Sequence, residues 1–257
     1  MPRTARVKSK SGIYHVIIRG TNRQEIFHDD EDCLRFLETL AKYKVKSEIK
    51  IYGWCLMNNH IHLLVKEGKE ELATTMKRIG VSFVGYYHCK YDTTGHLFQD
   101  RYKSENVESE EYLMTVIRYI HQNPIKAGLV SKPQDWKWSS YSEYYGKKLY
   151  PQELLDSELI LKLFSEDNEI AEKRFKEFNE QENEDNCLDD VITTRLRDED
   201  VRLEIKKIIS GINVGQIKSL PKDQRNKIIK KAKCIEGVTQ RQLARVLGVS
   251  QALISIT

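Results

Sequence analysis

The sequence predicts an α+β fold, because strand-like and helix-like segments follow one another in a β-α-β-β-α-β-α order over its first 146 residues. Short runs rich in β-branched and aromatic residues are separated by longer segments with the apolar periodicity of a helix. Two of the strand-like runs flank the turn-forming pair Asn58-Asn59, which indicates an antiparallel hairpin. A hydrophobic content of 40% supports a packed core.

The elements are expected at definite places along the chain. Six of them precede residue 108: a strand at 14–19, a helix at 30–45 with an acidic first turn, hairpin strands at 49–56 and 60–66, a helix from about 70 to 90, and a strand within 97–107. A last helix follows from Ser109, which can cap its N-terminus, and it is expected to end before Pro124 because proline disfavours a helix interior.

Two histidines in the second hairpin strand are the most informative residues of the chain. His60 and His62 project from one face of the strand while Ile61 points into the core on the other, because side chains alternate along a strand. Two imidazoles at this spacing can bind one divalent cation. The alternative is a pair of strand histidines without a ligand, since histidine is also tolerated at surfaces.

The helix that begins near Ser109 carries two tyrosines on one flank of its apolar stripe. Tyr112, Tyr119 and Asn123 fall within about 40° of one another around the helix axis. Tyr119 and Asn123 are one turn apart, so a phenol and an amide oxygen can face the same spot. Periodicity alone does not choose between the two tyrosines as a nucleophile.

Together, the strand and the helix suit the cleavage of a phosphodiester. A tyrosine hydroxyl that attacks a DNA phosphate forms a covalent phosphotyrosine, which keeps the ester linkage for rejoining. A divalent cation bound by His60, His62 and the side-chain oxygen of Asn123 would polarise the scissile phosphate. Imidazole suits Mg²⁺ poorly and Mn²⁺ tolerates it, so the sequence leaves the choice between Mg²⁺ and Mn²⁺ open.

At these residues the chain resembles the single-tyrosine HUH transposases, specifically the REP-associated tyrosine transposases. Five segments carry the resemblance: 12–16, 57–64, 95–104, 119–130 and 136–141. The resemblance implies a ferredoxin-like α+β domain with an antiparallel sheet. It also implies that His60 and His62 are metal ligands, that Asn123 completes the metal site, and that Tyr119 is the nucleophile. The implied activity is cleavage and rejoining of single-stranded DNA at hairpin-bearing repeats through a 5′-phosphotyrosine.

Charge divides the chain into three parts. Residues 1–146 carry 22 Lys/Arg and 18 Asp/Glu (+4), residues 147–192 carry 6 and 14 (−8), and residues 193–257 carry 14 and 6 (+8). Two basic blocks around an acidic one predict two nucleic-acid-binding modules with a solvated spacer, although ordinary surface charge is the alternative for the last block. The expected domains are a catalytic domain at 1–146, an acidic helical linker at 147–192 and a basic helical domain at 193–257.

The last helical domain ends in a segment that resembles a helix-turn-helix. Thr239 can cap a first helix, Gly248 opens a turn and Ser250 can cap a second helix. The segment also resembles the DNA-binding domain of bacterial replication initiators, which implies that the second helix enters the major groove of duplex DNA. The alternative is an ordinary helical hairpin packed on the catalytic domain.

Basic and polar side chains in both blocks are the expected DNA contacts. Those of the first block are expected to bind single strands, and those of the last block duplex DNA. The residues are Arg3, Arg6, Lys8, Lys10, Arg101 and Lys103 in the first block, and Arg241, Arg245 and Gln251 in the last.

Composition predicts a cytoplasmic protein. No apolar run of about 18 residues indicates a membrane span, and the basic N-terminus lacks the apolar stretch of a signal peptide. The five cysteines are scattered without a C-x-x-C pair, so reduced thiols and no structural zinc are expected. The sequence leaves a monomer or a homodimer open.

Two kinds of function are compatible with these features. One is a metal-dependent enzyme that nicks and joins single-stranded DNA, and the other is a domesticated, sequence-specific DNA-binding regulator without strand transfer. A replication initiator or relaxase is less favoured, because such proteins commonly carry further domains. The intact set of His60, His62, Tyr119 and Asn123 favours the enzyme, since binding alone does not require it.

Overall fold

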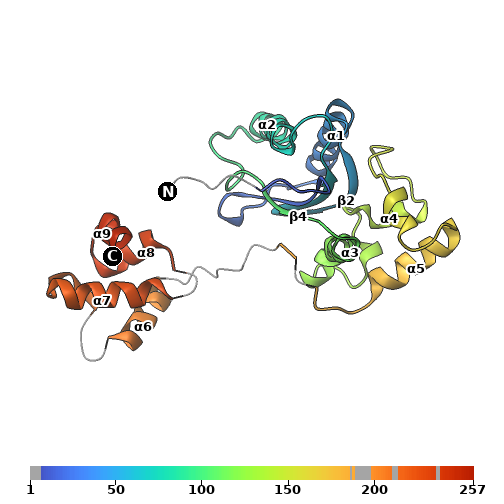
Figure 1. Cartoon of the computed structure of the whole chain (residues 1–257). Helices are drawn as coiled ribbons and strands as arrows, with labels where there is room; N and C mark the ends of the chain where they lie inside the picture. The colour runs from blue at the N-terminus through green and yellow to red at the C-terminus, as the bar shows by residue number, and fades with distance from the viewer. Residues whose placement is uncertain (1–6, 186, 189–197, 210–213, 236–237) are drawn as a thin grey trace. The chain divides into compact units, whose positions relative to one another are not determined.

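A computed structural model of the chain describes residues 7–185, 187–188, 198–209, 214–235 and 238–257. The chain divides into two compact units, Met1–Leu188 and Asp189–Thr257. One antiparallel sheet with the strand order β2-β3-β1-β4 forms the centre of the first unit (Figure 1). Its strands are β1 (Ile13–Arg19), β2 (Lys50–Met57), β3 (His60–Lys66) and β4 (Lys103–Asn106). The predicted α+β fold with an antiparallel sheet is confirmed.

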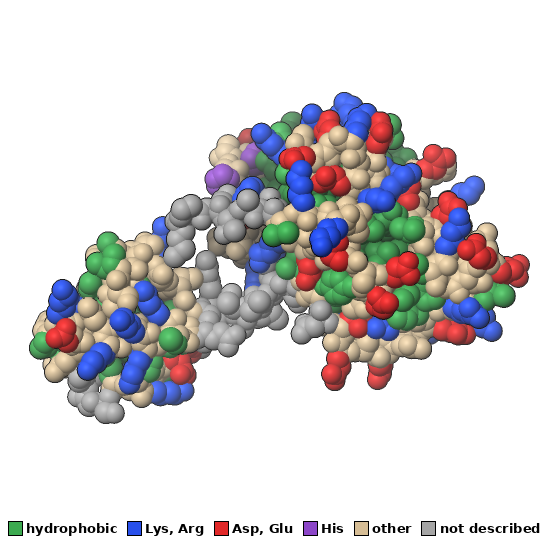
Figure 2. All heavy atoms as spheres, in the orientation of Figure 1, with side chains coloured by type: hydrophobic (Ala, Val, Ile, Leu, Met, Phe, Trp, Pro, Cys, Tyr) green, Lys and Arg blue, Asp and Glu red, His purple; other side chains and the backbone are tan. Residues whose placement is uncertain are grey.

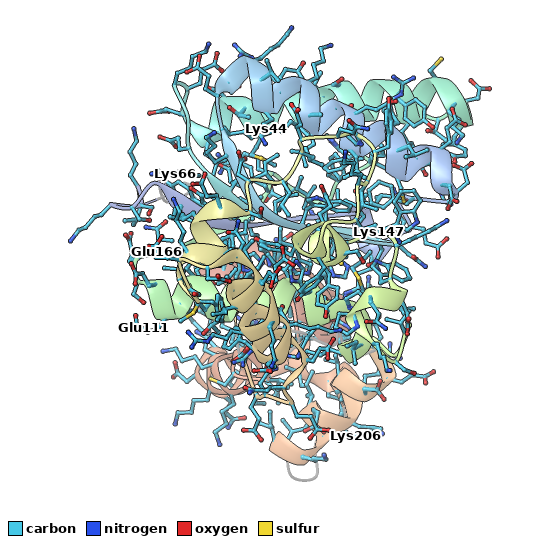
Figure 3. The ribbon with its side chains drawn as sticks, turned by 90° about the vertical axis from the view of Figure 1, so that its right-hand side faces the viewer. Lys44, Lys66, Glu111, Lys147, Glu166 and Lys206 are labelled. Atoms are coloured by element: carbon cyan, nitrogen blue, oxygen red, sulfur yellow. The ribbon has the colours of Figure 1, made fainter. Side chains whose placement is uncertain are left out.

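Helices cover both faces of this sheet. The helices α1 (Asp30–Ser47) and α2 (Leu72–Tyr91) pack on one face, and α3 (Glu110–Lys126) packs on the other. Figure 3 shows Lys44 on α1 and Glu111 on α3 on opposite sides of the sheet. The element order β1-α1-β2-β3-α2-β4, with this strand order, is the ferredoxin-like arrangement. Short 3-10 helices lie at Thr21–Arg23 (η1), Pro133–Asp135 (η2) and Ser140–Tyr145 (η3).

The alternation of side chains along β3 gives the two faces different chemistry. Ile61, Leu63 and Val65 are fully buried in the core beneath α1 and α2. His60 and His62 project to the other face, where the ring of His62 contacts α3. The other face of β3 thus carries the two imidazoles next to Leu64, which is fully buried in the apolar cluster under α3.

The sheet register brings further basic side chains to the histidine face. His60 pairs with Arg19 of β1, and His62 pairs with Ile17. Ile17 in turn pairs with Lys103 of β4. Directly paired residues project to the same face of a sheet, so Arg19 and Lys103 lie on the side of the two histidines.

The helix α3 lies very close to β2, and a glycine permits this approach. A Cβ atom on Gly53 would lie 2.3 Å from Cδ1 of Ile117, so a larger residue there would force the Ile117 side chain to move. The register of β2 also shifts between Ile51 and Gly53. The Ile117 side chain of α3 therefore packs directly against the backbone of β2 at this glycine.

The prediction that α3 ends before Pro124 is wrong, because the helix continues to Lys126. A proline in the last turn removes only one backbone donor, and the bonds that follow close the helix. Gly128, with φ of 70°, donates to the carbonyl of Ile125 (2.8 Å), and Leu129 donates to the carbonyl of Pro124 (2.9 Å). This pair of bonds is a Schellman motif, so the helix stops at the glycine and not at the proline.

The expected linker at 147–192 is not a linker in the part that the structure describes. Residues up to Leu188 belong to the first compact unit, and they include the helices α4 (Glu158–Lys162) and α5 (Asn168–Glu180). Ile160 and Phe175 are fully buried beside α3. Most acidic residues of this segment are exposed, while its apolar side chains pack on the core. The acidic composition therefore wrongly predicted a solvated linker.

The second unit is helical and has a core of its own. Its elements are α6 (Asp198–Ile208), η4 (Val214–Ser219), α7 (Lys222–Lys233), α8 (Gln240–Leu247) and α9 (Gln251–Ile256). Thr239 and Ser250 cap α8 and α9, and Gly248 between them has φ of 66°. The residues 193–197, where this domain was expected to begin, lie outside the described part. Among the described helices of the chain, none has the length and apolar content to cross a membrane.

Candidate active site

Three imidazoles and a phenol meet on the α3 face of the sheet. The ring centroid of His62 lies 4.9 Å from that of His60, 5.4 Å from that of His15 and 5.7 Å from that of Tyr119. His15 and His62 are fully buried, Tyr119 is 5% exposed and His60 is half-buried. The structure therefore brings the two predicted histidines and one predicted tyrosine together, and it adds a third histidine.

Asn59 orients the ring of His60. Its side-chain Nδ2 donates to the carbonyl of Arg23 (3.1 Å), which turns Oδ1 toward Nδ1 of His60 at 2.6 Å. An amide oxygen only accepts hydrogen bonds, so Nδ1 of His60 is the donor, and in the neutral form of the ring Nε2 holds the lone pair. This tautomer is the one that a metal-binding histidine needs.

His15 orients the ring of His62 in a similar way. Nε2 of His15 lies 3.1 Å from Nδ1 of His62. Burial lowers the pKa of His15 to about 3. Burial also lowers the pKa of His62 well below its usual range, with the charges of His60, His15 and Arg19 as further causes. Both imidazoles are therefore neutral, and Nε2 of His62 has no hydrogen-bond partner among the described residues.

The two tyrosines of α3 have different surroundings. The ring of Tyr119 contacts two of the imidazoles, and Nζ of Lys126 lies 5.0 Å from its centroid. Tyr112 instead donates its hydroxyl to Oε2 of Glu105 (2.6 Å). Burial and this bond raise the pKa of Tyr112, so its phenol stays protonated. The geometry thus distinguishes the two residues where helical periodicity did not.

Two imidazole nitrogens at this site are of a type that binds divalent metal ions. The rings of His60 and His62 are each oriented through Nδ1 by a neighbour, and Asn123 is half-buried on α3 one turn after Tyr119. No group of three or more His, Cys, Asp and Glu side chains in the described residues could hold a metal. A third protein ligand would therefore have to be of another type, and the amide oxygen of Asn123 stays the predicted one.

The predicted DNA contacts of the first unit lie at its surface. Lys8 forms an exposed ion pair with Glu71, with Nζ 2.7 Å from Oε1, and Lys10, Arg101 and Lys103 are exposed. Only Lys103 is placed on the histidine face by the sheet register. The predicted contacts Arg3 and Arg6 lie outside the described residues.

Of the predicted DNA contacts in the second unit, two side chains are exposed and one is bound within the unit. Arg241 and Gln251 are exposed. Arg245 binds Asp198 with two hydrogen bonds, from Nε to Oδ2 (2.8 Å) and from Nη2 to Oδ1 (2.7 Å). The Arg245 side chain therefore links α8 to α6 inside this unit.

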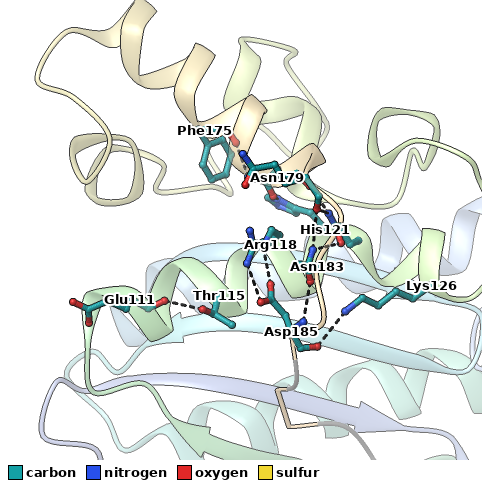
Figure 4. A network of polar contacts seen from close by, with 11 residues as sticks. Glu111, Thr115, Arg118, His121, Lys126, Phe175, Asn179, Asn183 and Asp185 are labelled. Atoms are coloured by element: carbon teal, nitrogen blue, oxygen red, sulfur yellow. Dashed lines mark hydrogen bonds and ion pairs between the residues drawn. The ribbon is translucent and has the colours of Figure 1, made fainter.

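A segment that begins in the last turn of α5 is bound to the helix that carries Tyr119 (Figure 4). We call this segment, residues 179–185, the α3 strap. Arg118 binds Asp185 with two short hydrogen bonds of 2.6 and 2.8 Å, and both side chains are nearly buried. Gln122 donates to the carbonyl of Asn179 (2.6 Å), and Lys126 donates to the carbonyl of Asp185 (3.2 Å). Three successive turns of α3 are therefore held from its outer side.

The sequence reasoning missed three residues of this site. His15 joins it only through the pairing of β1 with β3, which local periodicity does not reveal. Lys126 lies seven positions after Tyr119 and so on the same helix face, a signal that was available in the sequence. Asp185 lay within the expected linker, so its contact with Arg118 could not be inferred from spacing.

Sequence comparison finds a family and relatives that match the first part of the chain. Residues 8–123 match the family described as "Transposase IS200 like". A REP-associated tyrosine transposase of Escherichia coli K12 is 22% identical over 145 residues, which are 55% of this chain and 84% of the relative. A Haemophilus influenzae protein described as a "Putative REP-associated tyrosine transposase" is 26% identical over 160 residues. The match covers 56% of this chain and 88% of that relative.

A solved structure of a REP-associated tyrosine transposase bound to a REP hairpin is also similar. It is 21% identical, has a TM-score of 0.49, and the match covers 59% of this chain and 89% of that chain. The family match and the two relatives confirm the resemblance that the sequence predicted for the first part of the chain. They support a transposase-like enzyme that acts on DNA.

Proposed function

We propose that the first unit cleaves and rejoins single-stranded DNA through a covalent 5′-phosphotyrosine on Tyr119. The observation that carries this proposal is the contact of the Tyr119 ring with the ring of His62, at 5.7 Å between centroids. Catalysis of phosphoryl transfer depends on placing the nucleophile beside groups that stabilise the charge on the phosphate. Tyr119 meets this condition, and Tyr112, bonded to Glu105, does not.

In the proposed reaction, the Tyr119 hydroxyl gives up its proton to water and its oxygen attacks the phosphorus. The bond between phosphorus and the 3′ oxygen breaks, and that oxygen takes up a proton to leave as a 3′ hydroxyl. The 5′ phosphate stays ester-linked to Tyr119. Attack by a 3′ hydroxyl reverses these steps, so rejoining needs no outside energy source.

His60, His62 and Asn123 would hold the metal ion, Mg²⁺ or Mn²⁺. When bound, it would supply positive charge to the scissile phosphate. The two imidazoles, each oriented through Nδ1 by a neighbour, support this assignment. Arg19 and Lys103 on the same face, and Lys126 beside Tyr119, add positive charge for the flanking phosphates.

A cleavage assay tests the role of Tyr119. Single-stranded DNA with a hairpin repeat, the substrate class that the REP-associated relatives suggest, is incubated with the protein and Mn²⁺. Covalent adducts are then detected by denaturing electrophoresis. Tyr119→Phe should abolish the adduct and leave DNA binding within about twofold. Tyr112→Phe, the matched control on the same helix, should keep the adduct. Loss of the adduct in Tyr112→Phe alone would refute the assignment.

The metal requirement is tested separately. Protein treated with a chelator should form no adduct and should recover when Mn²⁺ or Mg²⁺ is added. A His60→Ala/His62→Ala double variant should also form none. His62 is fully buried against α3, so circular dichroism must first show that the double variant folds. Full activity in the chelator would exclude the metal.

The second unit is proposed to add affinity for duplex DNA. Basic side chains are spread over its visible face (Figure 2), and Arg241 and Gln251 are exposed at the starts of α8 and α9. A fragment that ends at Leu188 should still form the adduct but should lose most of its salt-sensitive duplex binding. Equal duplex affinity in the fragment and the full chain would leave the second unit without this role.

A further inference from the structure

A groove of about 1080 Å³ runs along α2, on the side of the sheet away from α3. Apolar and aromatic side chains line it, among them Val81, Val84, Phe98 and Tyr102. Val81, on the groove side of α2, is 66% exposed. The charged residues at its edge are Lys77, Arg101 and Asp100, and two histidines, His88 and His96, also border it.

This groove lies just across the sheet edge from the histidine pair. Gln99 donates to the carbonyl of Arg19 (2.8 Å), and Thr21 donates to the carbonyl of Leu97 (2.9 Å). Arg19 is the residue that pairs with His60. The segment at 97–102 therefore begins beside the catalytic end of β1 and leads into the edge strand β4.

We propose that the groove binds the unpaired DNA strand that continues from the scissile phosphate, an inference that rests on the proposed function. A strand that leaves the site over this edge passes Arg101 and then meets aromatic rings on which bases can stack. Basic side chains beside stacking rings are what proteins use to bind single strands without strict sequence preference.

A second groove on this unit does not have the same character. It holds about 420 Å³ beside Trp136 and Trp138. Its charged lining is four carboxylates and one lysine: Glu25, Asp29, Asp30, Asp135 and Lys137. This lining would repel phosphates, so the charge favours the groove along α2 for the strand.

A glycine on α2 offers a way to fill the groove without disturbing the fold. Gly85 lines it and is exposed, and a Cβ atom there would meet nothing within 4 Å. Gly85→Phe should therefore occupy the groove, and it should not weaken the helix because glycine is the poorer helix former. Cys89→Phe is the matched control, because Cys89 is exposed one turn later on α2 and does not line the groove.

The experiment measures binding of the full chain to fluorescent oligo(dT) of about 15 nucleotides by anisotropy. Gly85→Phe should weaken binding about tenfold, and Cys89→Phe should stay within about twofold of the natural chain. Val81→Glu, a change at a largely exposed position, should weaken binding as well. If Gly85→Phe does not fold, the oligo(dT) affinity of Val81→Glu tests the proposal in its place. Unchanged affinity in the folded variants would overturn the inference.

Two further measurements, adduct formation and sedimentation, distinguish failure of the groove proposal from failure of the proposed function and from dimer formation. If the natural chain forms the tyrosine adduct and both groove variants bind oligo(dT) normally, the groove inference fails and the proposed function stands. If no adduct forms with the natural chain, the proposed function fails whatever the groove variants do. If sedimentation shows a dimer that Gly85→Phe dissociates while oligo(dT) affinity is unchanged, a second copy fills the groove and the inference is wrong.

Discussion

Two regions follow the transposase-like part of the chain, and they pack in different ways. Residues 147–188 are strongly acidic, yet they fold into the first unit, where Ile160 and Phe175 are fully buried beside α3. The described residues from 198 onward are basic and bury a core of their own, with Ile205 and Ile229 at its centre. The comparison teaches that the apolar stripe of a segment, and not its net charge, decides whether it joins a neighbouring core.

Truncation at two places should produce the largest contrast between these regions. A chain that ends at residue 146 would expose the apolar outer side of α3, and we expect it to lose cooperative unfolding and at least about 100-fold in adduct yield. Each large apolar side chain removed contributes about 1.5–3 kcal/mol, against about 5–15 kcal/mol for a whole domain. A chain that ends at Leu188 should keep both properties. Circular dichroism melting and adduct yield are the measurements.

Equal cooperativity in the two truncated chains would contradict the packing seen for residues 147–188. The segment would then be the linker that its composition suggests.

A single core substitution in each region should sharpen the contrast. Phe175→Ala should lower the stability of the first unit by about 3–5 kcal/mol, because its ring packs on Tyr144 at 4.3 Å between centroids and on Phe164 at 5.4 Å. Ile205→Ala is the matched change in the second unit, at about 2–5 kcal/mol. Calorimetry should show a different transition shifting in each variant, and only Phe175→Ala should reduce adduct formation. A shift of both transitions by either variant would mean that the units do not unfold independently.

Loss of a contact in the α3 strap should slow the reaction of Tyr119 more than loss of an exposed ion pair does. Asp185→Asn leaves the guanidinium of Arg118 nearly buried without its carboxylate, and we expect a loss of about 2–3 kcal/mol and a several-fold slower adduct formation at unchanged DNA affinity. Glu158→Gln breaks the exposed Lys162–Glu158 pair of the same region and should change neither quantity measurably. A rate unchanged in Asp185→Asn, despite the loss of stability, would show that the strap does not position α3.

The smallest expected effect is on the pH dependence of the first unit. Burial raises the pKa of Glu143 to about 7. A carboxyl with a raised pKa in the folded state stabilises the fold below its ordinary pKa, and that contribution is lost as the pH rises through 7. Glu143→Gln should therefore have a free energy of unfolding about 1–2 kcal/mol higher than the natural chain at pH 8, after allowance for partial exposure of the side chain. The increase should be smaller at pH 5. The melting transition of the second unit is the internal control, and an equal gain at both pH values would contradict the burial of the charge.

Local pattern predicted most of the fold in the first unit. The alternation around His60 and His62, the helical stripe through Tyr119 and the hairpin at Asn58-Asn59 are short-range features, and the strands and helices form where these features lie. The face shared by the two histidines follows from strand geometry alone. The end of α3 was misplaced because one missing donor at Pro124 weighs less than the Schellman closure at Gly128.

The sequence by itself thus determined which residue types could make a phosphodiester-cleaving site and which strand and helix carry them. The tertiary structure decided which groups meet: the register of β1 on β3 brings His15 to His62, and the packing of α5 brings Asp185 to Arg118. It also distinguished Tyr119 from Tyr112, which lie on the same flank of the helix by periodicity. Tyr119 lies beside imidazoles, whereas Tyr112 is bonded to the carboxylate of Glu105. The physical reason is that periodicity is encoded by neighbours along the chain, whereas register and helix docking depend on the whole apolar surface that the core buries.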